Sequence, residues 1–266
     1  MSSLGTLSIH LDGARCRVGC DFCYLGARKD QVGRLDSALL EAALGRLDYH
    51  EIAVALSDPI EPAAPHLDRI FALARAPVSI TTTCAIAAHH PRLLHRAARI
   101  SLSIDPYKAP TAPARIASLC EKLRENSAAE IVLLVSLVSP QFCEQLFDGL
   151  LDQLLELPTV DKVALNALKP PPPWCDRIFW LQALNQIEPL LKRHLERRLF
   201  LDCYVAARFL KIGDCPARAD LSPTANGLAF RSCVYQPTAD FEFSRAEDAV
   251  ARLQNFQVPA ACPFPV

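Results

Sequence analysis

Residues 6–23 read TLSIHLDGARCRVGCDFC, and this stretch contains the two features that organise the rest of the chain. Its first six residues alternate between polar and apolar side chains, which predicts a strand. Cys16, Cys20 and Cys23 follow within eight residues, with the spacing C-x3-C-x2-C. The sequence therefore predicts a group of thiols on the loop that leaves the carboxyl end of a strand.

The remainder of the chain repeats a strand–helix alternation. Further strands are predicted at Glu51–Leu56, Val78–Thr83, Ile100–Ile104, Glu130–Val138, Lys162–Leu168 and Leu199–Val205. Helical spacing of apolar residues lies between them, at Asp36–Leu47, Pro65–Arg75, Pro91–Arg99, Ala112–Glu125, Ser139–Leu157 and Asp176–Arg198. We expect Pro189 to bend or divide the last helix. Repeated right-handed crossovers predict an α/β fold, a partial (β/α)6 barrel over residues 1–208, followed by a small loop-rich C-terminal extension or cap over residues 209–266.

Composition narrows the class of protein. The chain has 266 residues, 51% of them hydrophobic, and a formal net charge of −1, so no basic excess indicates nucleic-acid binding. It shows no signal-peptide pattern and no apolar run long enough to span a membrane, so we expect a cytoplasmic protein without membrane contact. Among its 11 cysteines, four lie singly in apolar patterns and are expected in the core: Cys84, Cys120, Cys143 and Cys175.

The spacing of the three clustered cysteines favours an iron–sulfur cluster. In a reducing compartment, clustered thiols indicate metal or redox chemistry rather than disulfides. Three thiolates can hold three irons of a [4Fe–4S] cluster and leave the fourth iron open. A structural zinc site is the alternative, but such a site needs four protein ligands. The one histidine near the three cysteines in the sequence is His10. No second C-x2-C occurs in the chain.

This cysteine loop, with Phe22 just before its last cysteine, resembles the signature of the radical S-adenosylmethionine (radical SAM) enzymes. The resemblance implies that a [4Fe–4S] cluster on Cys16, Cys20 and Cys23 binds S-adenosylmethionine (SAM). It implies reductive cleavage of SAM to a 5′-deoxyadenosyl radical, which abstracts hydrogen from a small-molecule or peptide substrate. It also implies an external one-electron reductant such as flavodoxin or ferredoxin.

The resemblance extends to cofactor contacts at the ends of other predicted strands. It implies SAM contacts at Phe22, Ser57, Asp58, Ser103, Asp105 and Ser136, with Ser139 as an alternative to Ser136. Ser57-Asp58-Pro59 takes the place of the family's Gly-Gly-Glu-Pro, and residues 101–106 resemble its Ser-Leu-Asp segment. Residues 163–166 end the sixth strand, where the family contacts adenine through backbone groups. The alternative for Asp58 and Asp105, each followed by proline, is a simple turn, and for Phe22 a core aromatic.

Cysteines after residue 200 resemble the ligands of a shortened auxiliary-cluster extension, the twitch domain related to SPASM domains. The resemblance implies that a second [4Fe–4S] cluster would use Cys203, Cys215, Cys233 and Cys262, with a hairpin around Gly227. The alternative is a cap without a cluster.

The favoured hypothesis is thus a radical SAM oxidoreductase or maturase in a biosynthetic or peptide-maturation pathway. Candidate proton-transfer residues are Tyr107, His89, His90 and Tyr204. The second hypothesis is a non-catalytic metal- or SAM-binding protein with a structural zinc or iron–sulfur site.

Overall fold

The structure is a computed structural model. It describes residues 4–11, 16–20, 22–23, 37–46, 49–58, 64–108, 112–168, 177–194, 198–201, 218–224, 227–231, 241–245, 248 and 251–252. The chain divides into two compact units. The first contains Met1–Thr82, Arg96–Ala98 and Pro216–Pro263, and the second contains Thr83–His95, Arg99–Cys215 and Phe264–Val266.

The first unit is built on a mixed sheet around the strand that precedes the cysteine loop. Across this sheet the strands are β10 (Phe241–Phe243), β9 (Gly227–Arg231), β8 (Arg218–Thr224), β1 (Leu4–Leu11), β2 (Tyr49–Leu56) and β3 (Val78–Thr83). The strands β8, β1, β2 and β3 are parallel, whereas β9 and β10 are antiparallel to their neighbours. The C-terminal strands therefore continue the sheet that carries the cysteine loop.

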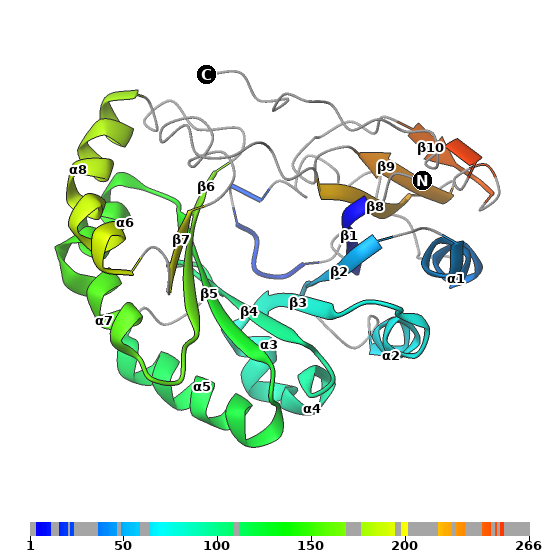
Figure 1. The fold of residues 1–266 in the computed structure, drawn as a ribbon, viewed down its shortest axis with the longest axis horizontal. Helices are drawn as coiled ribbons and strands as arrows, with labels where there is room; N and C mark the ends of the chain where they lie inside the picture. Colours follow the sequence, from blue (N-terminus) through cyan, green and yellow to red (C-terminus); the bar gives the residue numbers. More distant parts are fainter. Residues whose placement is uncertain are drawn as a thin grey trace. The chain divides into compact units, whose positions relative to one another are not determined.

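Side-chain alternation gives the first sheet one apolar and one polar face. In β1, Leu7, Ile9 and Leu11 are almost fully buried on one face, and Ser8 and His10 lie on the other. Figure 1 shows α1 (Ser37–Arg46) and α2 (Ala64–Leu73) together on one side of β1, β2 and β3. These helices bury apolar residues of their own, at Leu40, Leu44, Leu67 and Ile70.

The second unit is a parallel sheet with helices along its outer face. Its strands, in order, are β4 (Arg99–Ile104), β5 (Glu130–Leu137), β6 (Lys162–Ala167) and β7 (Leu199–Leu201). Its helical segments are α3 (Cys84–His89), α4 (Pro91–Leu94), α5 (Pro113–Asn126), α6 (Pro140–Gln145), η3 (Leu146–Leu150), α7 (Leu151–Glu156) and α8 (Arg177–His194). In Figure 1, α5, α7 and α8 lie on the same side of β4–β7.

The strands of this unit carry aliphatic residues on one face, whereas the other face combines serines of β4 and β5 with Val132 and Leu134 of β5. Ile100, Leu102 and Ile104 of β4 are fully buried and in register with equally buried residues of β5. The opposite face of β4 presents Ser101 and Ser103. A parallel sheet covered on both faces is apolar on both, and the second face of this sheet is less uniformly apolar than the first.

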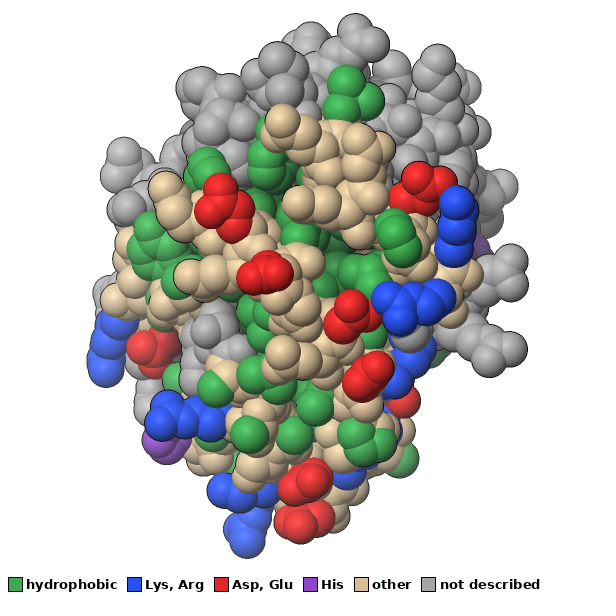
Figure 2. Space-filling view, turned by 90° about the vertical axis from the view of Figure 1, so that its left-hand side faces the viewer, with side chains coloured by type: hydrophobic (Ala, Val, Ile, Leu, Met, Phe, Trp, Pro, Cys, Tyr) green, Lys and Arg blue, Asp and Glu red, His purple; other side chains and the backbone are tan. Residues whose placement is uncertain are grey.

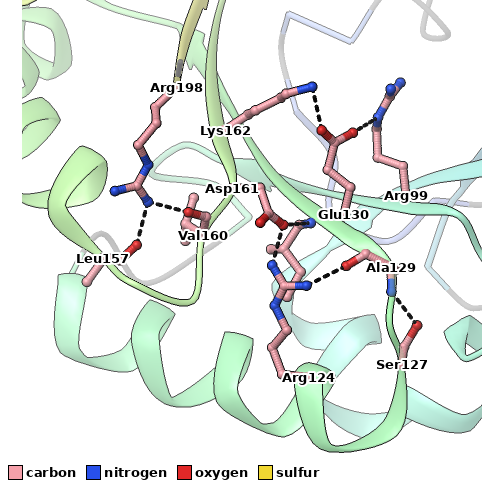
Figure 3. Close-up of polar contacts among 11 residues, drawn as sticks. Arg99, Arg124, Ser127, Ala129, Glu130, Leu157, Val160, Asp161, Lys162 and Arg198 are labelled. Carbon is pink, nitrogen blue, oxygen red and sulfur yellow. Dashed lines mark hydrogen bonds and ion pairs between the residues drawn. The ribbon is translucent and has the colours of Figure 1, made fainter. Parts of the chain in front are cut away.

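Ion pairs join the amino ends of the strands in the second unit (Figure 3). The carboxylate of Glu130 on β5 accepts a hydrogen bond from Arg99 Nε of β4 at 2.6 Å and pairs with Lys162 of β6. Asp161 accepts from the backbone N–H of Ile131 at 2.7 Å and pairs with Arg124 of α5. These contacts connect three neighbouring strands and one helix, and they favour a single register.

The strands agree closely with the sequence prediction. Each predicted strand is present, the first six within two residues of the expected start, and β3 has the expected bounds. The last is described only over Leu199–Leu201. The Ser139 helix start is also confirmed, because its Oγ accepts the N–H of Phe142 at 3.2 Å and Pro140 follows as the first helical residue.

The helices differ from the prediction in three places, and one of them is the helix expected over Pro91–Arg99, which ends at Leu94 as α4. The prediction missed α3, which Thr83 caps by accepting the N–H of Ile86 at 3.2 Å. The helix expected over residues 139–157 is interrupted, because Gly149 adopts a φ of 104°. The helix α8 continues through Pro189 without dividing, and the alternative that Pro189 bends it stays a prediction. Closure into a partial barrel and the boundary after residue 208 stay predictions.

Candidate functional site

The cysteine loop directly follows β1. Cys16, Cys20 and Cys23 are half-buried, and none of them forms a disulfide. The backbone N–H of Cys23 donates to the carbonyl of Cys20 at 3.1 Å, which turns the loop between these two thiols. Gly19 has a φ of 64°, a conformation that favours glycine, immediately before Cys20. The local sequence thus bends the backbone twice within the segment that carries the thiols.

A second strand end lies beside this loop. In the parallel β1–β2 pair, Leu11 is level with Leu56, so the two strands end together. The backbone N–H of Arg17 donates to the carbonyl of Asp58 at 2.9 Å. The structure therefore brings one predicted SAM contact, Asp58, next to the backbone of the cysteine loop. Ser57 precedes it and is also half-buried.

The donor set of the loop fits an iron–sulfur cluster. Three reduced thiols on one short loop are the ligands that such clusters use. In the described part of the chain, no three His, Cys, Asp or Glu side chains are gathered closely enough to hold a metal ion. The thiols thus have the right chemistry and partial exposure, and the loop would have to draw them together on binding. Phe22, between two of them, is half-buried as well.

The carboxyl edge of the second unit carries small polar side chains at the predicted positions. Ser136 of β5 is in register with Asn166 of β6, and Ser103 of β4 is in register with Leu134 of β5. All four residues are half-buried and lie on the same face of the sheet, which also carries the aliphatic Val132 of β5. Ser103 and Ser136 therefore stand on one face that combines polar and aliphatic side chains.

Asp105 lies at the same edge but is fully buried. Its Oδ1 accepts the N–H of Tyr107 at 3.0 Å, and its Oδ2 lies 3.2 Å from Lys108 Nζ. The N–H of Lys108 donates to the Asp105 carbonyl at 3.1 Å. The structure thus shows the turn that the sequence offered as the alternative at Asp105, with a lysine that sequence reasoning missed. The i, i+3 spacing of opposite charges across a Pro-containing turn was the available signal.

Three of the cysteines expected in the core are buried in the second unit. They are Cys84, Cys120 and Cys143, which confirms that part of the prediction. Burial raises the pKa of the Cys84 thiol to about 12, with a further contribution from the Asp105 carboxylate. Burial likewise raises the pKa of Cys120 to about 12. These thiols are neutral at pH 7 and unsuited to binding a metal.

Several predicted residues lie outside the described part of the chain. These are Cys175 and the four candidate ligands of a second cluster, Cys203, Cys215, Cys233 and Cys262, together with Tyr204. The predicted hairpin is present as the antiparallel strands β8 and β9. The strand β9 begins at Gly227. Of the candidate proton-transfer groups, Tyr107 is half exposed, and the exposed His89 has Nδ1 2.8 Å from the Ala85 carbonyl.

Charges of both signs are present on the face of the molecule drawn in Figure 2. On the face drawn in Figure 2, acidic and basic side chains of the described residues are interspersed, without an extended area of one sign. Among the described helices, none is both long and apolar enough to cross a membrane.

No protein-family model matches this chain, and no curated protein matches it. Among the solved structures that match is coproporphyrinogen III oxidase (HemN) from Escherichia coli, a radical SAM enzyme. It shares 12% identity over 86% of this chain and 67% of its own, with a TM-score of 0.49. Two structures of GH113 β-1,4-mannanase, one of a complex, share 11% and 10% identity over 76% of this chain and 72% and 71% of theirs. Both have TM-scores of 0.40. At TM-scores below 0.5, these likenesses carry no conclusion about this chain.

Proposed function

We propose that this protein is a radical SAM enzyme. The observation that carries the proposal is the C-x3-C-x2-C loop of three reduced, partly exposed thiols at the carboxyl end of β1. Parallel α/β folds bind their ligands at the carboxyl ends of the strands. A loop with three thiolates in this position is suited to a [4Fe–4S] cluster with one open iron.

Each proposed site residue then has a distinct task. Cys16, Cys20 and Cys23 would hold the cluster, which when bound supplies the electron that cleaves SAM. The Asp58 carboxylate, on a strand end tied to the loop through Arg17, suits the ammonium group of SAM. Ser103 and Ser136, both half-buried near the carboxyl ends of β4 and β5, are proposed to donate or accept hydrogen bonds with the cofactor.

The substrate is proposed to be a small molecule or a peptide side chain from which hydrogen is abstracted. A one-electron donor such as flavodoxin or ferredoxin would have to supply the reducing equivalent. Should Cys203, Cys215, Cys233 and Cys262 hold a second cluster, it could accept an electron from the substrate radical and make the net reaction an oxidation. The hairpin β8–β9, which pairs with β1 through β8, supports the hairpin part of that assignment.

Metal analysis of the anaerobically purified chain tests this proposal. We expect iron and acid-labile sulfide, about four irons per chain for one cluster or eight for two. The variant with Cys16, Cys20 and Cys23 all changed to alanine should lose about four irons. The matched control changes the buried Cys84, Cys120 and Cys143 to alanine and should retain all of them. Stoichiometric zinc in place of iron would instead support the non-catalytic metal-binding protein.

A further inference from the structure

The second face of the sheet in the second unit stays accessible near the carboxyl ends of its strands. The strand register places six residues on this part of the face, which we call the Asn166 surface: Ser103, Leu134, Ser136, Ala164, Asn166 and Phe200. Phe200 exposes 40% of its surface, and the other five are half-buried. On the first face, by contrast, Ile100, Leu102 and Ile104 are fully buried. A ligand can therefore reach the Asn166 surface.

The Phe200 ring is supported from the amino end of the same face. Lys162 Nζ lies 5.1 Å from the centroid of this ring, and Lys162 also pairs with Glu130 of β5. A cation over an aromatic ring is attracted to it, so the contact restricts how Phe200 can turn. The ring thus offers apolar area in a restricted position, which lowers the entropy that binding costs.

The charges near the Asn166 surface are compensated within the second unit. Lys162 is paired with Glu130, and the fully buried Asp105, which follows β4, is paired with Lys108. None of the six residues of the surface is charged. A carboxylate or phosphate would lose its water there without gaining a cation of its own. The surface therefore favours an uncharged ligand.

Two polar side chains lie together at the carboxyl end of this surface. Ser136 of β5 is level with Asn166 of β6, on strands about 4.8 Å apart. In the described part of the chain, neither side chain has a hydrogen-bond partner. The carboxamide of asparagine carries an acceptor and two donors in one plane. A ligand that replaces the water around Asn166 without loss must therefore present a donor next to an acceptor.

Apolar side chains lie one row nearer the amino ends. Leu134, Ala164 and Phe200 are level with one another on β5, β6 and β7. Two residues along a strand and one strand across separate Phe200 from Asn166 by about 8 Å. A residue of a peptide matches this layout, because a planar amide group with a donor and an acceptor stands next to an extended side chain.

We propose that the Asn166 surface binds the substrate, and that the substrate is an amide of an apolar amino acid, as in a peptide. Asn166 pairs with the amide group, and Phe200 and Leu134 pack against the adjacent apolar side chain. The identification of this ligand as the substrate rests on the proposed function, whereas the binding itself does not require the cluster. A nucleobase also presents a donor next to an acceptor, so the experiment has to separate the two.

Calorimetric titration of the full-length, anaerobically purified chain tests the surface. The probe is N-acetylphenylalaninamide, and two uncharged compounds each lack one part of it. N-acetylglycinamide has no apolar side chain, and methyl 3-phenylpropanoate has no N–H group. We expect the probe to bind saturably and about tenfold more tightly than either of them, the size of one buried apolar group or of one unpaired polar group.

Substitutions assign each preference to its residue. Asn166→Ala should remove the preference over methyl 3-phenylpropanoate, and Phe200→Ala should remove the preference over N-acetylglycinamide, which Phe200→Tyr should retain. Should Asn166→Ala fail to fold, Asn166→Leu gives the same comparison at a volume nearer to that of asparagine. The matched controls are Asn185→Ala and Leu181→Ala on α8, because both residues are exposed there. They should bind all three compounds as the wild type does.

Three results would overturn the inference. The first is no saturable binding of the probe, and the second is an unchanged preference in either Asn166→Ala or Phe200→Ala. The third is tighter binding of adenosine than of the probe, with loss of adenosine binding in Asn166→Ala, because the surface would then recognise a nucleobase. A chain that binds the probe through Asn166 and Phe200 but contains no iron would contradict only the proposed function.

Discussion

The two edges of the sheet in the second unit are built from different side chains. At the amino edge, charged residues on neighbouring strands fix one another: Arg99 and Lys162 both bind Glu130, and Arg124 binds Asp161 (Figure 3). At the carboxyl edge, the same strands carry an uncharged polar residue one position before their last, Ser103, Ser136 and Asn166, and the Asp105–Lys108 turn follows β4. The difference teaches that charged pairs hold this sheet together at one edge, while the other edge, where parallel α/β folds bind ligands, lacks such a cluster among the described residues.

The largest effect on stability is expected from Asp161→Ala. The substitution removes the ion-pair partner of Arg124. It also removes the acceptor for the backbone N–H of Ile131, a buried residue. Unfolding by urea should show a loss of about 1–3 kcal/mol. Asp161→Asn keeps one acceptor and should lose less. Equal stability of Asp161→Ala and wild type would remove the distinction between the two edges.

A smaller effect, with a characteristic pH dependence, is expected from Glu130→Gln. Burial by itself would raise the pKa of Glu130, but hydrogen bonds and charge from Lys162 and Arg99 lower it overall. A carboxyl group with a lowered pKa stabilises the fold above its ordinary pKa, and this contribution is lost as the pH falls through the lowered value. At pH 7 the variant should lose about 1 kcal/mol.

The difference between Glu130→Gln and wild type should therefore shrink as the pH is reduced from 7 toward and through the lowered pKa. Thermal unfolding at a series of pH values measures it. Glu188→Gln serves as the control, because its pair with Lys192 is exposed, and we expect no measurable change. A difference that grows on acidification would contradict the assigned role of Glu130.

The smallest effect on stability is expected at the carboxyl edge, from Ser136→Ala. Its side chain is half-buried near the carboxyl end of β5, so unfolding should change by less than about 0.5 kcal/mol. The affinity for SAM should fall about three- to tenfold, the size of one lost hydrogen bond. Ser127→Ala is the matched control, since Ser127 Oγ accepts the Ala129 N–H at 3.1 Å just before β5.

Ser127→Ala should lower the stability and leave the affinity for SAM unchanged. A loss of SAM affinity in Ser127→Ala together with unchanged affinity in Ser136→Ala would contradict the comparison.

The sequence allowed the strands and the cysteine loop to be predicted because both are local patterns. Alternation at Leu7, Ile9 and Leu11 and the Ser139-Pro140 cap require no knowledge of distant residues. The helix α3 was missed because it follows β3 without a break and is only six residues long. Short apolar segments do not separate strand from helix by periodicity alone.

The polar contacts likewise divide into short-range contacts, which the sequence can indicate, and long-range contacts, which it cannot. Arg124 and Asp161 are 37 residues apart, and nothing in either segment specifies the other, so only the folded chain reveals their pair. Asp105 and Lys108 are three residues apart, and the turn between them was foreseen as an alternative. What the sequence could not show was that Asp105 is fully buried, because burial depends on how distant segments of the chain pack around it.

The central claim is that the cysteine loop makes this chain a SAM-cleaving enzyme. Its most direct test is the amount of 5′-deoxyadenosine formed from SAM by the anaerobically reconstituted, dithionite-reduced protein. The wild type should release this product, and the variant with Cys16, Cys20 and Cys23 changed to alanine should release none above the protein-free background. Absence of product from a wild type that contains iron and sulfide, or equal product from both proteins, would contradict the claim.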